Sequence, residues 1–297
     1  MNLFKFIIEK LKSLLKIKTV FIIPKNVELS ENLIFDTDLD KSITLNGVAY
    51  EILKLLNGIN TIDDIVSELI KKYNVKKDVL ERDINTVVSN LQDKNLVESK
   101  ITGNKIAILF LNLGIFQYVH KKRYSIPKSK IFTFLLLLYI IIKKLFIMWI
   151  ISIITVYFFI NNFASEFTDK INYAISGYFV FIFAMIFGFV LHEWIHIAVS
   201  KIQKQRLHGY ILARRFTVSI VKVNTESSLL SILLGPLIPS ILGIAFILIS
   251  IKIQSIMTFL VGIGFAINII NLLPFTQDGK GILEKILMKK LMKGAIK

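Results

Sequence analysis

Long apolar runs fill the second half of the chain, and few folds can accommodate them. Four stretches are candidates for crossing a bilayer, at residues 145–161, 173–197, 228–251 and 253–274. A hydrocarbon core of about 30 Å needs about 20 helical residues, so the first run requires an extension toward Ile131, past Lys143 and Lys144. Hydrophobic residues make up 54% of the chain, above the roughly 45–50% of soluble domains. We therefore predict a mainly α, polytopic membrane domain over residues 131–297.

Basic residues beside these runs predict an orientation. The net charge is +16, and Lys and Arg cluster in the 120–130 stretch, the 201–222 loop and the tail after Lys280. Because basic loops stay on the cytosolic side, we predict a multi-pass protein of the cell membrane with both termini in the cytosol. The lipid bilayer is then a partner. Nucleic acid is not expected as a partner, since we see no module that combines basic and aromatic residues.

The first half of the chain carries most of the acidic residues and is predicted to form a small separate domain. Residues 1–25 have apolar positions at a spacing of three to four with lysines between them, which predicts a basic amphipathic helix. It lies either on the inner membrane surface or against the soluble domain. Residues 26–104 contain β-like stretches near Val27–Leu29 and Asn32–Phe35, then three short helices. Residues 105–130 are expected to be a linker, with a strand or a membrane-surface segment inside it.

One motif in the second apolar run carries chemistry: His192-Glu193-Trp194-Ile195-His196. Residues at i and i+4 share one helix face, so both imidazoles can bind one metal ion, while Glu193 can take a proton from a metal-bound water. The chain has no cysteine, so any zinc must be held by His and carboxylate. The alternative is that these are buried polar residues with a packing role, although such groups in apolar spans are usually functional.

A site with two histidines needs a third protein ligand, and Asp278 is the candidate. It follows the fourth run, at the same predicted membrane depth as His192 and His196. One Zn²⁺ per chain is expected, although these ligand types also suit another divalent metal. The alternative for Asp278 is a turn residue paired with Gly279. His120 and His208 are expected to be surface residues.

These residues resemble the site-2 protease family, whose mark is a His-Glu-x-x-His helix followed by an Asn-x-x-Pro…Asp-Gly segment. The resemblance covers about residues 173–282, with Asn271, Pro274, Asp278 and Gly279 in the second element. It implies a zinc metalloendopeptidase that hydrolyses peptide bonds within the membrane. His192, His196 and Asp278 would bind zinc, Glu193 would activate water, and Asn271 would hydrogen-bond the substrate or the oxyanion.

Two further stretches fit that resemblance. Gly235-Pro236 matches a Gly-Pro element of the family. Residues 210–223 alternate in polarity and are predicted to form a hairpin, whose free edge would hold an extended substrate. An ordinary basic cytosolic loop is the alternative for this stretch.

Residues 28–100 resemble the PqqD-like peptide-recognition domain, a winged or three-helix unit. The residues that carry the resemblance are Leu45, Asn46, Ala49, Ile52, Leu56, Asn57, Gly58, Thr61, Ile62, Ile65, Asp83, Leu91, Leu96 and Val97. The resemblance implies that residues 26–104 bind the leader of a ribosomally made precursor peptide by adding it to a sheet edge. A generic helical domain is the alternative.

Together the two parts resemble the peptide zinc metalloproteases of epipeptide gene clusters. The expected function is cleavage of a ribosomally synthesised, modified precursor peptide, which releases the core peptide to an exporter partner. Two alternatives stay open. One is regulated proteolysis of a membrane-bound regulator, and the other is a non-enzymatic immunity or transport accessory protein that binds the peptide.

Overall fold

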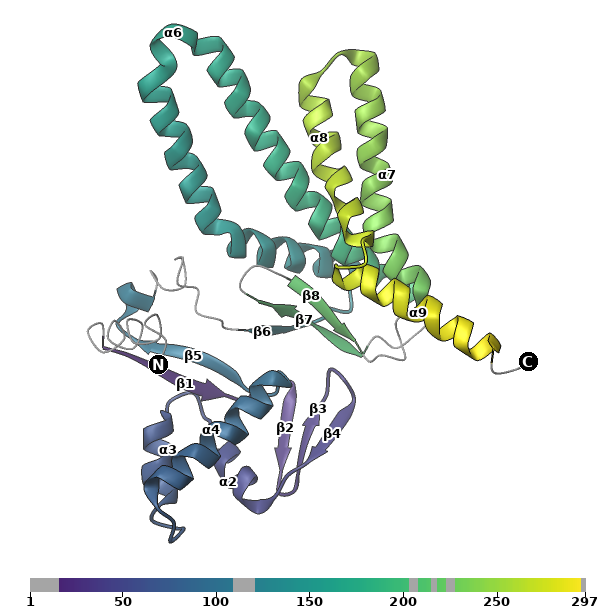
Figure 1. Cartoon of the computed structure of the whole chain (residues 1–297). Helices are drawn as coiled ribbons and strands as arrows, with labels where there is room; N and C mark the ends of the chain where they lie inside the picture. Colours follow the sequence, from purple (N-terminus) through teal and green to yellow (C-terminus); the bar gives the residue numbers. More distant parts are fainter. Residues whose placement is uncertain (1–15, 109–120, 203–207, 215–217, 223–227, 295–297) are drawn as a thin grey trace. The chain divides into compact units, whose positions relative to one another are not determined.

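A computed structural model describes residues 16–108, 121–202, 208–214, 218–222 and 228–294 (Figure 1). Within helix α6, the side chains of residues 145–149 and 159–171 lie outside this description. The chain divides into two compact units. Unit 1 comprises Met1–Ser125 and His208–Ser219, and unit 2 comprises Ile126–Leu207 and Ile220–Lys297. The two units are described separately below.

Unit 1 contains the three predicted helices, and local capping explains where two of them begin. They are α2 (Gly47–Leu55), α3 (Ile62–Leu69) and α4 (Lys77–Asp93). The Asn46 side chain accepts a hydrogen bond from the Ala49 N–H at the start of α2. Thr61 and Asp64 form a reciprocal capping box at the start of α3. Helix α4 has no side-chain cap.

The helices of unit 1 bury their apolar faces in one core. Ile52, Ile65 and Ile84, one from each helix, are fully buried there. Val27 and Ile34 of the neighbouring strands join the same cluster. Burying side chains of this size contributes roughly 1.5–3 kcal/mol each, so the three short helices are stabilised by packing rather than by length.

The strands of unit 1 form antiparallel pairs. The strands are β1 (Ile17–Ile22), β2 (Val27–Ser30), β3 (Leu33–Asp36), β4 (Lys41–Thr44), β5 (Glu98–Gly103), β6 (Lys122–Ser125) and β7 (Gly209–Ala213). The predicted β2 and β3 are confirmed, and β4 extends them into a three-stranded sheet, while β1 pairs with β5 and β6 with β7. Strand β8 (Val218–Lys222) follows β7 in sheet order, as the predicted hairpin requires, and the division between the units falls within it.

Two expectations for this part of the chain differ from the structure. The helix predicted over residues 1–25 is a strand at Ile17–Ile22, because Ile17 and Val20 turn into the core and the backbone pairs with β5. Residues 1–15 lie outside the described part. Within the expected linker at 105–130, Lys122–Ser125 form strand β6. This strand was not predicted, because its partner β7 lies far along the chain and leaves no local pattern in the sequence.

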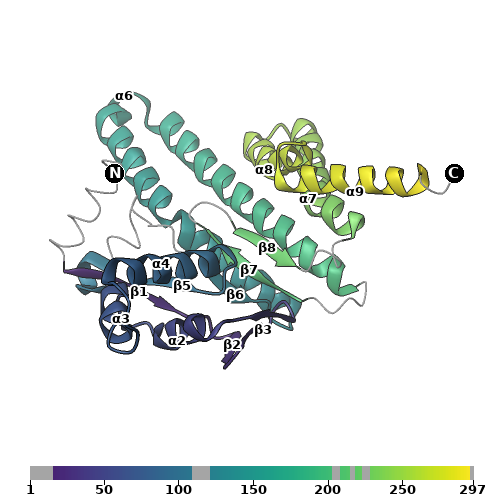
Figure 2. The same cartoon turned by 60° about the horizontal axis from the view of Figure 1, so that its bottom comes forward.

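Unit 2 is helical. Helix α6 (Lys130–Ile202) doubles back on itself in Figures 1 and 2. It is followed by α7 (Leu229–Ile253), α8 (Ile256–Ala266), the 3₁₀ helix η2 (Ile267–Leu272) and α9 (Gln277–Gly294). Helices α7 and α8 run side by side in both views. Gln254 separates them in a left-handed conformation.

Two helical segments in the described residues are long and apolar enough to cross a membrane, Asn172–Ser200 and Leu229–Ile253. They coincide with the second and third predicted spans. The fourth, predicted over 253–274, is shorter, because helix α8 starts at Ile256 and η2 ends at Leu272. It reaches the required length only when it is joined to Gln277–Met288 across a 41° bend. Much of the first predicted span, 145–161, lies outside the described side chains.

Candidate metal centre

Helix α6 brings two imidazoles of the His-Glu-x-x-His motif together. His192 and His196 are both buried, and their Nε2 atoms lie 3.1 Å apart. Two tetrahedral ligands with bonds of about 2.0–2.1 Å to one zinc ion are separated by roughly 3.3 Å. One helical turn has therefore placed both nitrogens at a spacing that suits a shared ion.

Asp278 joins this pair from the first turn of α9. Its Oδ2 atom lies 2.9 Å from His192 Nε2 and 3.4 Å from His196 Nε2. One ligand atom from each of the three residues lies within 4.8 Å of the others, so the three form a group that can hold a metal ion. The structure thus brings together the residues that the sequence singled out as ligands.

Hydrogen bonds behind the two imidazoles orient them. His196 Nδ1 lies 2.7 Å from the backbone oxygen of Ser231 on α7. A carbonyl oxygen can only accept, so Nδ1 carries the proton and the Nε2 lone pair is left for a metal. This second contact is typical of histidine ligands. Ser231 was missed in the sequence, because a single serine in an apolar helix is a weak signal.

Asn271, which is predicted to contact substrate, lies beside His192. Its side-chain amide is 3.5 Å from His192 Nδ1, at the outer limit of a hydrogen bond. The amide atom that faces His192 is Nδ2, which donates, whereas a His192 that binds a metal through Nε2 carries its proton on Nδ1 and donates as well. The contact is a hydrogen bond in that state only when the amide is turned so that its oxygen faces Nδ1.

Glu193 lies next to the ligand group. Its Oε1 atom is 4.0 Å from His192 Nε2, and its side chain is 20% exposed. The carboxylate is therefore close enough to exchange a proton with a water bound at the cluster. His208 is not part of the ligand group, and His120 lies outside the described residues.

Two glycines allow the surrounding segments to approach the ligands. A Cβ atom at Gly235 on α7 would overlap the imidazole of His196, and one at Gly279 would overlap the backbone oxygen of Leu273. Gly235 lets α7 pack directly on the metal-binding turn, and Gly279 lets the first turn of α9 lie close to the backbone of Leu272 and Leu273. The Gly-Pro element of the sequence therefore has a steric role beside His196.

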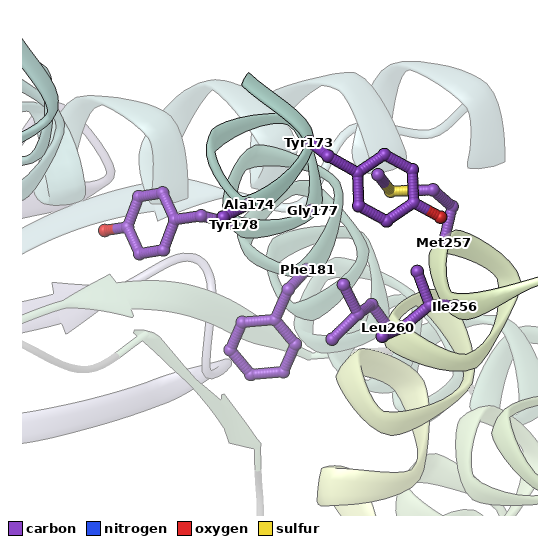
Figure 3. A pocket seen from close by; sticks show the side chains of 8 residues that line it. All are labelled: Tyr173, Ala174, Gly177, Tyr178, Phe181, Ile256, Met257 and Leu260. Carbon is purple, nitrogen blue, oxygen red and sulfur yellow. The ribbon is translucent and has the colours of Figure 1, made fainter. Parts of the chain in front are cut away.

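A separate apolar pocket lies between α6 and α8 (Figure 3). Its volume is about 310 Å³, and its lining includes Tyr173, Phe181 and Leu260. Phe181 precedes His192 by eleven residues on α6, which is about 16 Å along a helix axis. The lining contains no carboxylate or imidazole and is otherwise apolar apart from the phenols of Tyr173 and Tyr178, so the pocket holds no candidate metal ligand of the kind found at His192.

Comparison with known proteins concerns unit 1. Residues 31–97 match the family model for coenzyme PQQ synthesis protein D (PqqD). A curated relative, the "PqqA binding protein" of Gluconobacter oxydans (strain 621H), is 27% identical over 60 residues, which are 20% of this chain and 62% of the relative. No solved structure matches the chain. The two matches support a peptide-recognition domain of the PqqD type in unit 1, and the family match ends well before α6.

Proposed function

We propose that the chain is a membrane-embedded zinc metalloprotease that cleaves a ribosomally made precursor peptide. One observation carries this proposal: His192, His196 and Asp278 converge from two helices, with the Glu193 carboxylate beside them. Three protein ligands and a water are the usual composition of a catalytic zinc site. Imidazole and carboxylate ligands, with His196 fixed by a backbone carbonyl, fit that metal.

The reaction that suits these groups is peptide-bond hydrolysis. A bound zinc ion supplies an acidified water and polarises the carbonyl to be attacked. Glu193 takes the proton of the attacking water and gives it to the leaving nitrogen. The backbone oxygen of Ser231 holds the imidazole of His196 in the tautomer that leaves Nε2 free to bind a metal, and Asn271 lies beside the imidazole of His192.

Unit 1 supports a peptide as the substrate. The match to PqqD and the similarity to a protein named for binding PqqA favour binding of a precursor peptide. In the proposal this domain captures the leader, and the scissile segment lies extended along strand β8. The apolar helices and the basic loops favour a multi-pass position in the cell membrane with cytosolic termini, so an exporter would receive the released core peptide.

The test compares wild type with Glu193→Gln in liposomes. In liposomes, both proteins receive a proteome-derived peptide mixture. In a separate experiment, each protein is co-expressed with a precursor peptide that is encoded beside its gene. New peptide termini are identified by mass spectrometry, and metal content is measured by elemental analysis. We expect about 10²–10⁴-fold slower cleavage in the variant, with unchanged zinc content. Glu284→Gln, an exposed change on α9, is the matched control.

Three outcomes would contradict the proposal. Equal cleavage by wild type and Glu193→Gln would remove Glu193 from the chemistry. Zinc-loaded wild type that binds the precursor without cutting it would favour the accessory-protein function, which the match to a peptide-binding domain also supports. Cleavage of a membrane-bound regulator in place of the precursor would favour regulated proteolysis.

A further inference from the structure

A polar cluster surrounds the backbone of His196, on the side away from its ligand atom. The His196 carbonyl oxygen accepts hydrogen bonds from Ser200 Oγ at 2.8 Å, Ser231 Oγ at 3.1 Å and Lys222 Nζ at 3.0 Å. Ser200 and Ser231 are almost fully buried. Ser200 belongs to α6 itself, whereas Ser231 lies on α7 and Lys222 on β8, so two of the three donors fasten other elements to this turn.

Lys222 joins the cluster from a strand, whereas Ser200 and Ser231 lie on helices. It is the last residue of strand β8, and its Nζ also donates to Ser200 Oγ at 2.8 Å and lies 3.5 Å from Ser231 Oγ. Its ammonium thereby contacts α6 and α7 at once. A cation close to the end of α6, at Ile202, also meets the negative end of the helix dipole.

A lysine ammonium loses hydration when it is placed among buried hydroxyls, and the loss must be offset by its hydrogen bonds. Lys222 satisfies this condition with acceptors on two helices. The contact links β8 to the same residue that supplies a metal ligand. Movement of β8 relative to His196 would break these bonds, so the ammonium sets the distance between the strand and the ligand group.

We propose that Lys222 is a positioning residue, which ties the end of strand β8, residues 220–222, to the backbone of His196 so that a peptide lying along this end of β8 meets the metal centre at a fixed distance. The role in cleavage rests on the proposed function, whereas the tie between β8 and α6 does not. Without Lys222, β8 loosens while the three metal ligands keep their own contacts, including the bond from His196 Nδ1–H to Ser231.

The test uses hydrogen exchange, which does not depend on activity. In Lys222→Met, the amides of residues 220–222 should exchange at least tenfold faster than in wild type, with those of α6 near His196 little changed. Zinc content should remain one ion per chain. Peptide cleavage, where wild type shows it, should lose efficiency mainly through a higher KM. Lys252→Met, which removes an exposed lysine of α7, should match wild type in every measurement.

The absence of cysteine from the chain allows a rescue. Lys222→Cys should behave like Lys222→Met, and alkylation of the new thiol with 2-bromoethylamine should restore the ammonium and slow exchange in β8. Unchanged exchange of β8 in Lys222→Met, or no rescue by the alkylated side chain, would overturn the proposal. So would a Lys222→Cys protein that fails to fold, since Lys222 would then serve stability. A wild type that cleaves nothing would defeat the proposed function and leave the exchange test intact.

Discussion

Asp278 Oδ2 lies 2.9 Å from His192 Nε2, although the two residues belong to different helices, α9 and α6. The contact brings a carboxylate from the start of one helix to an imidazole near the end of another. Removing either partner leaves the other buried without its counterpart, which is costly unless an ion is shared between them. Two predictions concern this ligand group, and two concern buried charges of unit 1.

Asp278→Asn should release the metal. The change keeps the shape of the side chain and removes its charge, so we expect the affinity for zinc to fall by more than the ~10–100-fold that loss of an outer-shell partner causes. Zinc per chain is measured by elemental analysis and by competition with a chelator. Glu284→Gln on the same helix should retain wild-type content. Full retention of zinc in Asp278→Asn would mean that the third ligand lies elsewhere.

Gly235→Ala should weaken the metal site through its packing. The added methyl group would overlap the ring of His196, and overpacking of this kind costs about 1–3 kcal/mol. We expect a lower melting temperature and weaker zinc binding. Gly281→Ala is the matched control, because its Cβ would meet only ordinary contacts with Ile232 and Ala favours a helix over Gly. Wild-type zinc affinity in Gly235→Ala would contradict the steric role.

Arg123→Met should destabilise unit 1. The guanidinium binds both carboxylate oxygens of Asp36 and one of Asp38, stacks at 3.8 Å on the ring of Tyr210, and is almost fully buried. Removing one partner of a buried ion pair costs about 3–5 kcal/mol. Hydrogen exchange of α4 amides would report this loss.

Two further variants control the Arg123 experiment. Lys121→Met breaks a surface pair with Asp93, and this change should cost only about 0–1 kcal/mol. Asp36→Leu combined with Arg123→Met should recover part of the stability, because it removes the uncompensated charge. A double variant no better than the single one would show that the guanidinium acts through packing.

Glu98→Gln should change how the stability of unit 1 depends on pH. Burial raises the pKa of the Glu98 carboxyl above its ordinary value of 4.5, and the hydrogen bond from the Arg123 N–H opposes the rise. Because the pKa of Glu98 is higher in the folded chain than in the unfolded chain, the folded state is favoured when the carboxyl is protonated. This contribution to stability is present below pH 4.5 and is lost as pH rises through the pKa of the folded state. Gln keeps the acceptor oxygen without the charge.

The variant should therefore gain stability over wild type at neutral pH and differ little in acid. Pulse proteolysis of unit 1 at both pH values measures the difference. Glu28→Gln, at an exposed position of β2, should show no such gain. A loss of stability at neutral pH in Glu98→Gln would mean that the ionised carboxylate is favoured by its surroundings, contrary to the direction of the pKa shift.

Features that depend on neighbours in sequence were predicted from the residues alone. Thr61 opens α3 as expected, because a capping box involves residues three apart. His192 and His196 meet because the helix repeat places i and i+4 on one face. The apolar runs at 172–200 and 229–253 are helices of the required length, since composition and length suffice for that conclusion.

Features that depend on distant segments were decided only by the tertiary structure. Strand β1 pairs with β5 across several intervening helices and strands, and β6 pairs with β7 across helix α6, so no local pattern encodes these partners. The sequence by itself singled out Asp278 as a candidate ligand, but its distance from His192 follows from how α9 packs against α7 and η2. The contacts of Ser231 and Lys222 with His196 were likewise visible only in the tertiary structure. The sequence around a serine or a lysine does not indicate which distant residue it will contact, because that depends on how α7 and β8 pack around His196.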